Sequence, residues 1–252
     1  MFSLNNKSKI KKVFQKFLPD YVINCAAMTS LDDCEKHPNR AIQINSNLVI
    51  YLNKLCTNFK SKLIQISTDH YYLTKGKKKE SHEVKLLNVY AKSKYLAELN
   101  TLTGQNENLV IRTNFIGFYK RNNKFGFSEW LFRNLQRNKK INLFSDYFHS
   151  PIHVRVLTKI ICRLISKNAK GIFNVASKDT VSKSDFCKKI FKKLKMNPDC
   201  QLKSVFDLKT CRANENGLDV SKTEKFLSLK MPYSTDTAKS IVNDFIKIKK
   251  KI

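Results

Sequence analysis

The stretch that decides the fold runs from residue 63 to residue 98, beginning LIQISTDHYY and ending NVYAKSKYLAE. It starts as a short apolar strand, residues 63–66, which breaks at Ser67-Thr68-Asp69. A helix opens near Asn88 and carries Tyr90 and Lys94, whose spacing of four puts both side chains on one helix face. A hydroxyl at a strand end followed by Tyr-x-x-x-Lys on the next helix is the arrangement that reduces a carbonyl, or oxidises an alcohol, with a nicotinamide cofactor.

The flanking segments alternate strand and helix. Residues 8–17 show helical periodicity, and Pro19-Asp20 leads into a strand at 21–25 that is apolar on both faces. A helix from about residue 38 to 56 and a strand at 109–112 complete the pattern. This alternation predicts an α/β fold with a Rossmann-like, doubly wound parallel sheet.

Beyond residue 112 the pattern changes to a smaller α/β part packed on the sheet. We expect helices at 128–138 and 154–165, a turn at 146–151, a strand at 171–175 and a basic helix at 186–194. The predicted division is therefore 1–112 for the dinucleotide-binding part and 113–252 for the second part.

The formal charge is +28, from 48 Lys+Arg against 20 Asp+Glu. A polyanionic partner is one interpretation; a genome composition that favours Lys, Asn and Ile is the other. The lysines are scattered, and no aromatic RNA-binding signature or zinc-finger spacing accompanies them, so nucleic acid is disfavoured. A positive field still suits substrates that carry phosphates.

The seven cysteines contain no C-x-x-C pair, which predicts reduced and mostly buried thiols in a cytoplasmic protein. No apolar run is long enough for a membrane span, and no signal peptide is indicated. We expect no metal site, because no second ligand stands at metal spacing from His70.

Taken together, Ser67-Thr68-Asp69, Tyr90-x-x-x-Lys94 and the late segment Arg212-x-Asn214…Leu218-Asp219-x-Ser221-Lys222 resemble the extended short-chain dehydrogenase/reductases, and within them the dTDP-4-dehydrorhamnose reductase-like enzymes. The resemblance covers nearly the whole chain. It implies an NAD(P)-dependent reductase of a 4-keto nucleotide sugar in polysaccharide or O-antigen sugar biosynthesis, with residues 113–252 binding the substrate.

The resemblance assigns the catalytic roles. Tyr90 would protonate the sugar carbonyl, Thr68 would hold the carbonyl oxygen, and Lys94 would lower the pKa of Tyr90 and bind the nicotinamide ribose. The other cofactor contacts it implies are Asn24, Ala26, Ala27, Thr29, Asn45 and Ser67. The substrate contacts it implies are Asp69, His70, Tyr72, Asn114, Trp130, Ser150 and Arg212, with Arg112 as a further candidate; alone, Trp130 is more typical of a core.

A dinucleotide site of this kind needs a glycine-rich turn after the first strand, and none of the six glycines forms one or precedes residue 21. The strand at 21–25 resembles the family's fourth, so it is expected to be an exposed apolar edge. Three explanations stay open: a start codon further upstream, a broken remnant, or a short pseudoenzyme or half-protein completed by a partner. The alternative function is therefore an inactive fragment or a non-catalytic sugar-nucleotide-binding module. A homo-oligomer is also possible.

Overall fold

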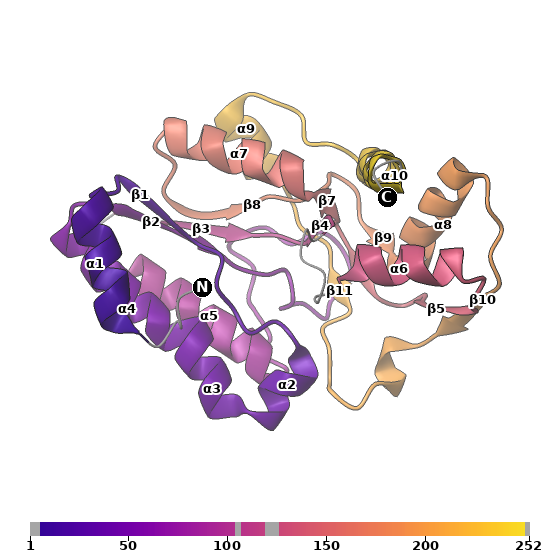
Figure 1. Cartoon of the computed structure of the whole chain (residues 1–252), viewed down its shortest axis with the longest axis horizontal. Coiled ribbons are helices and arrows are strands. Elements are labelled where there is room, and N and C mark those ends of the chain that lie inside the picture. The colour runs from indigo at the N-terminus through magenta and orange to yellow at the C-terminus, as the bar shows by residue number, and fades with distance from the viewer. Residues whose placement is uncertain (1–5, 104–106, 119–125, 250–252) are drawn as a thin grey trace.

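The computed structural model describes residues 6–103, 107–118 and 126–249. Its main sheet is parallel and has the strand order β1-β2-β3-β8. Helices cover both faces, with α1, α4 and α5 on one side and α7 and α9 on the other (Figure 1). The predicted Rossmann-like parallel α/β architecture is confirmed.

The elements of the first half are α1 (Lys7–Phe17), β1 (Tyr21–Asn24), α2 (Leu31–Lys36), α3 (Pro38–Ile42), a π-helical turn η1 (Gln43–Asn47), α4 (Leu48–Asn58), β2 (Lys62–Ile66), α5 (Val89–Leu102) and β3 (Leu109–Arg112). Those of the second half are β4 (Phe115–Ile116), α6 (Phe127–Gln136), β5 (Ile141–Phe144), β6 (Phe148–His149), β7 (Ile152–His153), α7 (Val154–Ser166), β8 (Gly171–Asn174), β9 (Val181–Ser182), α8 (Lys183–Leu194), β10 (Cys200–Lys203), η2 (Val205–Asp207), β11 (Glu215–Asn216), α9 (Ser221–Leu227) and α10 (Ser234–Lys249).

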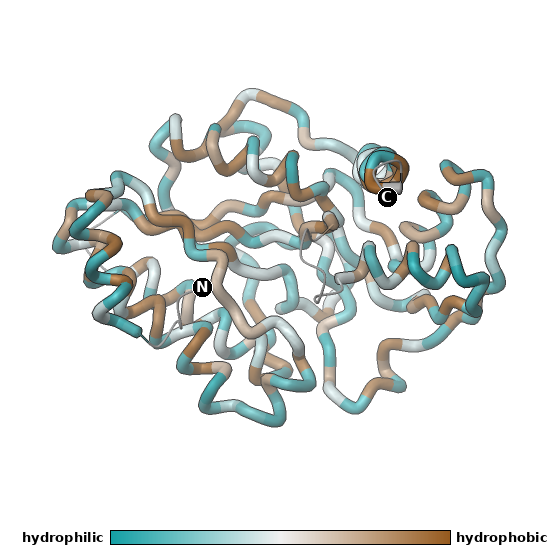
Figure 2. Tube along the Cα trace, in the orientation of Figure 1, coloured by the Kyte–Doolittle hydropathy of each residue, from teal (hydrophilic) through white to brown (hydrophobic). Residues whose placement is uncertain are grey.

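Strand β2 shows why these residues form a central strand. Leu63 packs into the core beneath α1 and α4, whereas the next residue, Ile64, packs into the core on the other face of the sheet. Side chains alternate across a strand, so a strand covered on both faces must be apolar at successive positions. The hydropathy of the chain follows this arrangement, with apolar residues along the strands in the middle of the molecule (Figure 2).

The helix predicted from about residue 38 to 56 is interrupted by the π-helical turn at 43–47. This turn buries Asn45, which is 1% exposed. Its amide accepts a hydrogen bond from the N–H of Met28 (2.7 Å) and donates to the Met28 carbonyl (3.0 Å) and the Ser93 hydroxyl (2.8 Å). Asn45 therefore ties the turn after β1 to helix α5.

Strand β1 lies at the edge of the main sheet, as expected. Tyr21 and Ile23 are 45% and 46% exposed, while Val22, on the opposite face of the strand, packs against the core beneath α4. An edge strand with exposed apolar side chains has backbone groups free to pair with another strand.

The second half contributes β8 to the main sheet, where it pairs with β3, so the division at residue 112 stays a prediction.

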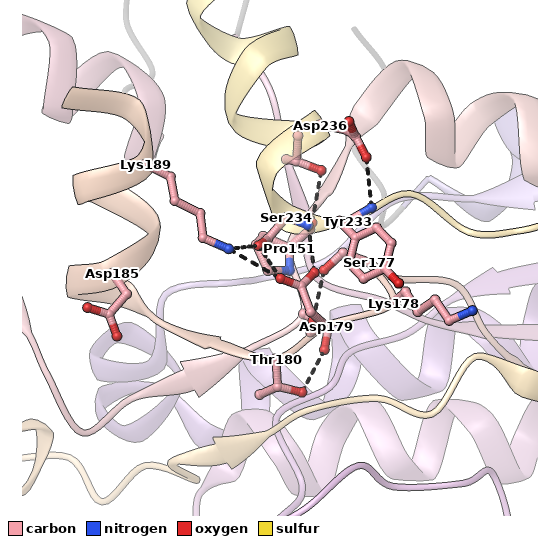
Figure 3. Close-up of polar contacts among 12 residues, drawn as sticks. Pro151, Ser177, Lys178, Asp179, Thr180, Asp185, Lys189, Tyr233, Ser234 and Asp236 are labelled. Atoms are coloured by element: carbon pink, nitrogen blue, oxygen red, sulfur yellow. Dashed lines mark hydrogen bonds and ion pairs between the residues drawn. The ribbon is translucent and has the colours of Figure 1, made fainter. Parts of the chain in front are cut away.

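Asp179 fixes helix α10 against α8. Its carboxylate accepts hydrogen bonds from the N–H and the hydroxyl of Ser234 (both 2.6 Å) and forms an ion pair with Lys189 (3.2 Å) (Figure 3). The predicted turn at 146–151 is wrong in part, because Phe148–His149 forms β6 and pairs with both β9 and β11.

All seven cysteines are free, but only three of them are buried. The prediction that most are buried is wrong. Cys25 directly follows the edge strand β1, and Cys200 begins the fully exposed strand β10, so neither position has a covering layer. In the part of the chain that the structure describes, no helix is long and apolar enough to cross a membrane.

A buried ion pair links α5 to β3. Arg112 approaches Glu98 at 2.7 Å, and their side chains are 3% and 1% exposed. Arg112 also donates to the Tyr72 hydroxyl (2.9 Å) and to the carbonyl of Glu80 (3.1 Å). The carboxylate accepts two further hydrogen bonds, from Ser67 (2.5 Å) and Tyr71 (3.1 Å).

Replacing Arg112 by Met should lower the free energy of unfolding by about 3–5 kcal/mol, because it leaves the Glu98 carboxylate buried without its partner charge. Urea denaturation measures this loss. Arg137→Met is the matched control, since Arg137 is exposed, and it should change stability by no more than about 0.5 kcal/mol. Equal stabilities for the two variants would contradict the structural role of the pair.

Candidate active site

A cavity of about 220 Å³ opens where β2 and β3 end. In parallel α/β sheets the carboxyl ends of the strands are where ligands bind. Its lining residues come from the strand ends, from helices α2 and α5, and from the second half of the chain: Thr29, Leu31, Thr68, Asp69, His70, Tyr90, Asn114, Phe144, Tyr147, Lys183, Val205, Leu208 and Arg212.

Tyr90 and Thr68 meet at this cavity. The Asn88 side chain caps α5 by accepting a hydrogen bond from the N–H of Ala91 (2.8 Å). The helix therefore begins at Val89, and Tyr90, in its first turn, faces the end of β2. Burial raises the pKa of Tyr90 to about 12, a hydrogen bond from Thr68 opposes that rise, and the charge of Asp69 adds to it. Tyr90 is therefore protonated at neutral pH and lines the cavity together with Thr68.

The effect of Lys94 on the pKa of Tyr90 stays a prediction. The Lys94 ammonium donates to the carbonyl of Ile66 (2.7 Å), at the end of β2, and does not line the cavity with Tyr90. The groups that set the pKa of Tyr90 are its burial, Thr68, Asp69 and Cys34. Burial lowers the pKa of Lys94 itself to about 8, against the opposing charge of Glu98.

Asp69 is a buried carboxyl at the cavity. Burial raises its pKa to about 7, although the Asn114 amide donates to it at 2.8 Å and lowers the pKa. The other end of the Asn114 amide lies 3.3 Å from a ring nitrogen of His149. Asn114 follows β3 and Asp69 follows β2, so the hydrogen bond between their side chains joins the ends of the two strands.

His70 lies between two tyrosine rings. Its ring centroid is 6.2 Å from that of Tyr90 and 6.4 Å from that of Tyr147. Its Nε2 is buried and has no hydrogen-bond partner among the described residues. Burial lowers the pKa of His70 to about 4, and the charges of Arg212 and Lys183 lower it further, so the ring is neutral at physiological pH.

The sequence reasoning missed Lys183 and Tyr147. Lys183 lies 4.7 Å over the Tyr147 ring, and burial lowers its pKa. Antiparallel pairing of β6 with β9 brings them together, and the Lys183 N–H donates to the Tyr147 carbonyl (2.9 Å). The only signal in the sequence was the helix start at Ser182-Lys183-Ser184-Asp185, which by itself indicates a solvated lysine.

Arg212 contributes a second cation to the cavity. Its side chain is 25% exposed, and one terminal nitrogen lies 3.6 Å from Asp32. Its Nε is buried without a hydrogen-bond partner among the described residues. Lys183 and Arg212 therefore give the second-half wall of the cavity a positive potential.

The remaining predicted cofactor contacts lie around the end of β1 and β2 and do not line the cavity, except for Thr29. Asn24 donates to Gln65 (2.8 Å) and accepts from the N–H of Ala26 (3.1 Å), so it shapes the turn that contains Ala26 and Ala27. Ser67 and Asn45 are both occupied by bonds within the protein.

Three predicted substrate contacts do not reach the cavity. Tyr72 binds Arg112 inside the core. Ser150 is fully buried and contacts Thr180 (3.2 Å) and the N–H of Leu218 (3.3 Å). Trp130 is 38% exposed and packs against Phe127 on α6, so it belongs neither to the core nor to the cavity.

The described residues fit one end of a nicotinamide dinucleotide. Tyr90, Thr68 and Lys94 surround the end of β2, where the reactive ring and its ribose would lie. A pyrophosphate needs a tight glycine turn at a helix start. Among the described residues, positive φ at glycine occurs only at Gly76, in the loop after β2, and at Gly171, which begins β8, so neither provides a glycine turn at a helix start.

The described part of the chain also holds no cluster of three or more potential metal ligands.

Comparison with known proteins places this geometry in a family. The model of the RmlD substrate binding domain matches residues 2–246. The probable low-salt glycan biosynthesis reductase Agl14 of Haloferax volcanii is 26% identical over 240 residues, which cover 92% of this chain and 80% of that protein. The spore coat polysaccharide biosynthesis protein SpsK of Bacillus subtilis is 27% identical over 188 residues, covering 74% of this chain and 65% of SpsK.

Solved structures that resemble this chain include dTDP-4-dehydrorhamnose reductases. The dTDP-4-dehydrorhamnose reductase of Bacillus anthracis, determined in complex with NADP, superposes with a TM-score of 0.88 at 25% identity, covering 96% of this chain and 87% of that one. A hypothetical dTDP-4-dehydrorhamnose reductase of Sulfolobus tokodaii gives a TM-score of 0.81 at 28% identity, over 92% and 82% of the two chains. The chain thus belongs to the RmlD substrate binding domain family.

Proposed function

We propose that this protein is a reductase of a 4-keto nucleotide sugar that uses NAD(P)H, of the dTDP-4-dehydrorhamnose reductase type, and that it acts in glycan biosynthesis. The observation that carries the proposal is that Tyr90 and Thr68 line the same cavity at the strand ends, where Thr68 acts on the pKa of Tyr90. The relatives named as reductases and the neighbour solved with NADP support it.

Tyr90 supplies the proton. The reduced nicotinamide, when bound, supplies hydride to the carbonyl carbon. The proton of the Tyr90 hydroxyl passes to the carbonyl oxygen, so the ketone becomes an alcohol and Tyr90 is left as a phenolate. Thr68 holds the carbonyl oxygen beside that hydroxyl, which fixes the direction of proton transfer.

Lys94 would hold the ribose next to the nicotinamide. Its pKa of about 8 keeps most of the amine protonated at neutral pH, so it can donate hydrogen bonds to ribose hydroxyls. Its present acceptor, the Ile66 carbonyl, fixes the ammonium at the end of β2.

The substrate's phosphates would face the second-half wall. Lys183 and Arg212 both line the cavity, and a guanidinium fork suits a diphosphate. His70, neutral and with an unpaired Nε2, would hydrogen-bond a sugar hydroxyl.

One observation favours a second candidate, a sugar-nucleotide-binding module without catalysis: no glycine turn for pyrophosphate occurs among the described residues. The two candidates differ in cofactor binding. Titration of the full chain with NADPH and with dTDP separates them, because the module would bind dTDP alone.

Replacing Tyr90 by Phe should lower kcat by about 100-fold or more, since the proton donor is removed while the ring remains. The assay follows NADPH oxidation with dTDP-4-dehydrorhamnose. Tyr95→Phe is the matched control, because Tyr95 lies on the same helix and does not line the cavity, and it should retain activity. Full activity of Tyr90→Phe, with an unchanged melting temperature for both variants, would refute the assignment.

The reduction rate should fall as pH rises through about 7. Asp69 ionises there, and its negative charge then raises the pKa of Tyr90 and makes proton donation harder. Tyr147 and Lys183 also interact with this carboxyl. Asp69→Asn keeps the shape and removes the charge, so kcat between about pH 6 and about pH 8 should vary less than in the wild type. Identical profiles would show that Asp69 does not govern the rate.

A further inference from the structure

Asp32 connects the two walls of the cavity. It lies in the first turn of α2, directly after Leu31, which lines the cavity from the first half of the chain. Its Oδ1 accepts a hydrogen bond from the Thr210 hydroxyl at 2.5 Å, and the Arg212 Nη2 lies 3.6 Å from the same oxygen. Thr210 and Asp32 are 178 positions apart in the sequence, and Figure 1 shows α2 facing this segment of the second half.

The backbone directly before Arg212 is fixed as well. Asn88, which caps the helix of Tyr90, donates to the carbonyl of Cys211 at 2.9 Å. Thr210, which donates the bond to Asp32, is itself buried at 8% exposed. The segment 210–212 is therefore held from two points of the first half, one of them the helix that carries the proposed acid.

The contact between Asp32 and Arg212 orients the guanidinium without using all of its donors. At 3.6 Å it is longer than a charge-assisted hydrogen bond, which is about 2.7–2.9 Å. The Nε is buried and has no partner among the described residues, although Arg212 lines the cavity. A buried donor without an acceptor is unfavourable, and an oxygen of a bound anion would satisfy it.

Stability alone does not account for this arrangement. The Asp32 side chain is 58% exposed, and ion pairs of exposed carboxylates contribute little to folding. The arrangement instead fixes the direction of a long, flexible cation at the cavity, which reduces the entropy lost when an anion binds.

We propose that Asp32 is a positioning residue for substrate binding: with Thr210 it holds Arg212 so that the guanidinium meets the diphosphate of a nucleotide sugar. This inference rests on the proposed function for the class of ligand. Asp32 acts through Arg212 and does not itself contact the substrate.

The test is titration of the full chain with dTDP, with thymidine as the ligand that lacks phosphates. Asp32→Ala should weaken dTDP binding by about tenfold and leave thymidine binding unchanged. In the Arg212→Ala background the same substitution should have no further effect, because two residues that act as one unit are not additive. In turnover assays, KM should rise while kcat is retained.

Two further variants serve as controls for the Asp32→Ala result. Asp33→Ala removes the same charge from the same turn of α2, where Asp33 does not line the cavity, and it should bind dTDP like the wild type. If Asp32→Ala lowers the melting temperature strongly, Thr210→Val, which keeps both charges and removes the hydrogen bond, should still weaken dTDP binding.

Three results would overturn the inference. The first is unchanged dTDP affinity in Asp32→Ala, and the second is failure of the wild type to bind dTDP. The third is tighter dTDP binding in Asp32→Ala, which would mean that Asp32 competes with phosphate for Arg212. The dTDP titration is carried out without NADPH. A protein that binds dTDP with the expected Asp32 dependence but does not turn over would therefore refute the reductase and keep this inference.

Discussion

The carboxylate of Glu98 is the group on which the geometry of the site depends. Tyr90, Lys94 and Glu98 follow one another at intervals of four along α5, so they share the helix face that meets the end of β2. Glu98 binds Ser67, Lys94 binds the carbonyl of Ile66, and Tyr90 meets Thr68. The Glu98 charge is stable in the interior because Arg112, Ser67 and Tyr71 all donate to it.

This arrangement separates chemistry from recognition. In the proposed function, the proton donor Tyr90 and the residues that position it come from one strand–helix pair, whose two members are joined by hydrogen bonds of Glu98 and Lys94. The cations come from the second half, where Lys183 begins α8 and Arg212 precedes β11. A reductase built in this way can keep its reaction while the second half changes with the sugar nucleotide, which agrees with the different glycans named for its relatives.

Burial changes the acid–base chemistry of the residues that line the cavity. Burial makes Asp69 a weak acid and His70 a weak base, and it keeps Tyr90 protonated. The desolvation of Asp69 has a cost to folding at neutral pH, since the ionised form is disfavoured in the folded state. Such shifts are typical of sites that handle protons.

The sequence by itself determined the parallel sheet, the position of Tyr90 at the start of α5 and the edge strand. These depend on local spacing: successive apolar residues in β2, the Asn88 cap and the four-residue interval from Tyr90 to Lys94. Only the tertiary structure decided where Lys94 points, that Lys183 and Tyr147 line the cavity, and that Asp32 contacts Arg212. Those contacts join segments far apart in the chain, and whether a lysine or an aspartate is solvated or faces a cavity depends on which distant segment packs against it.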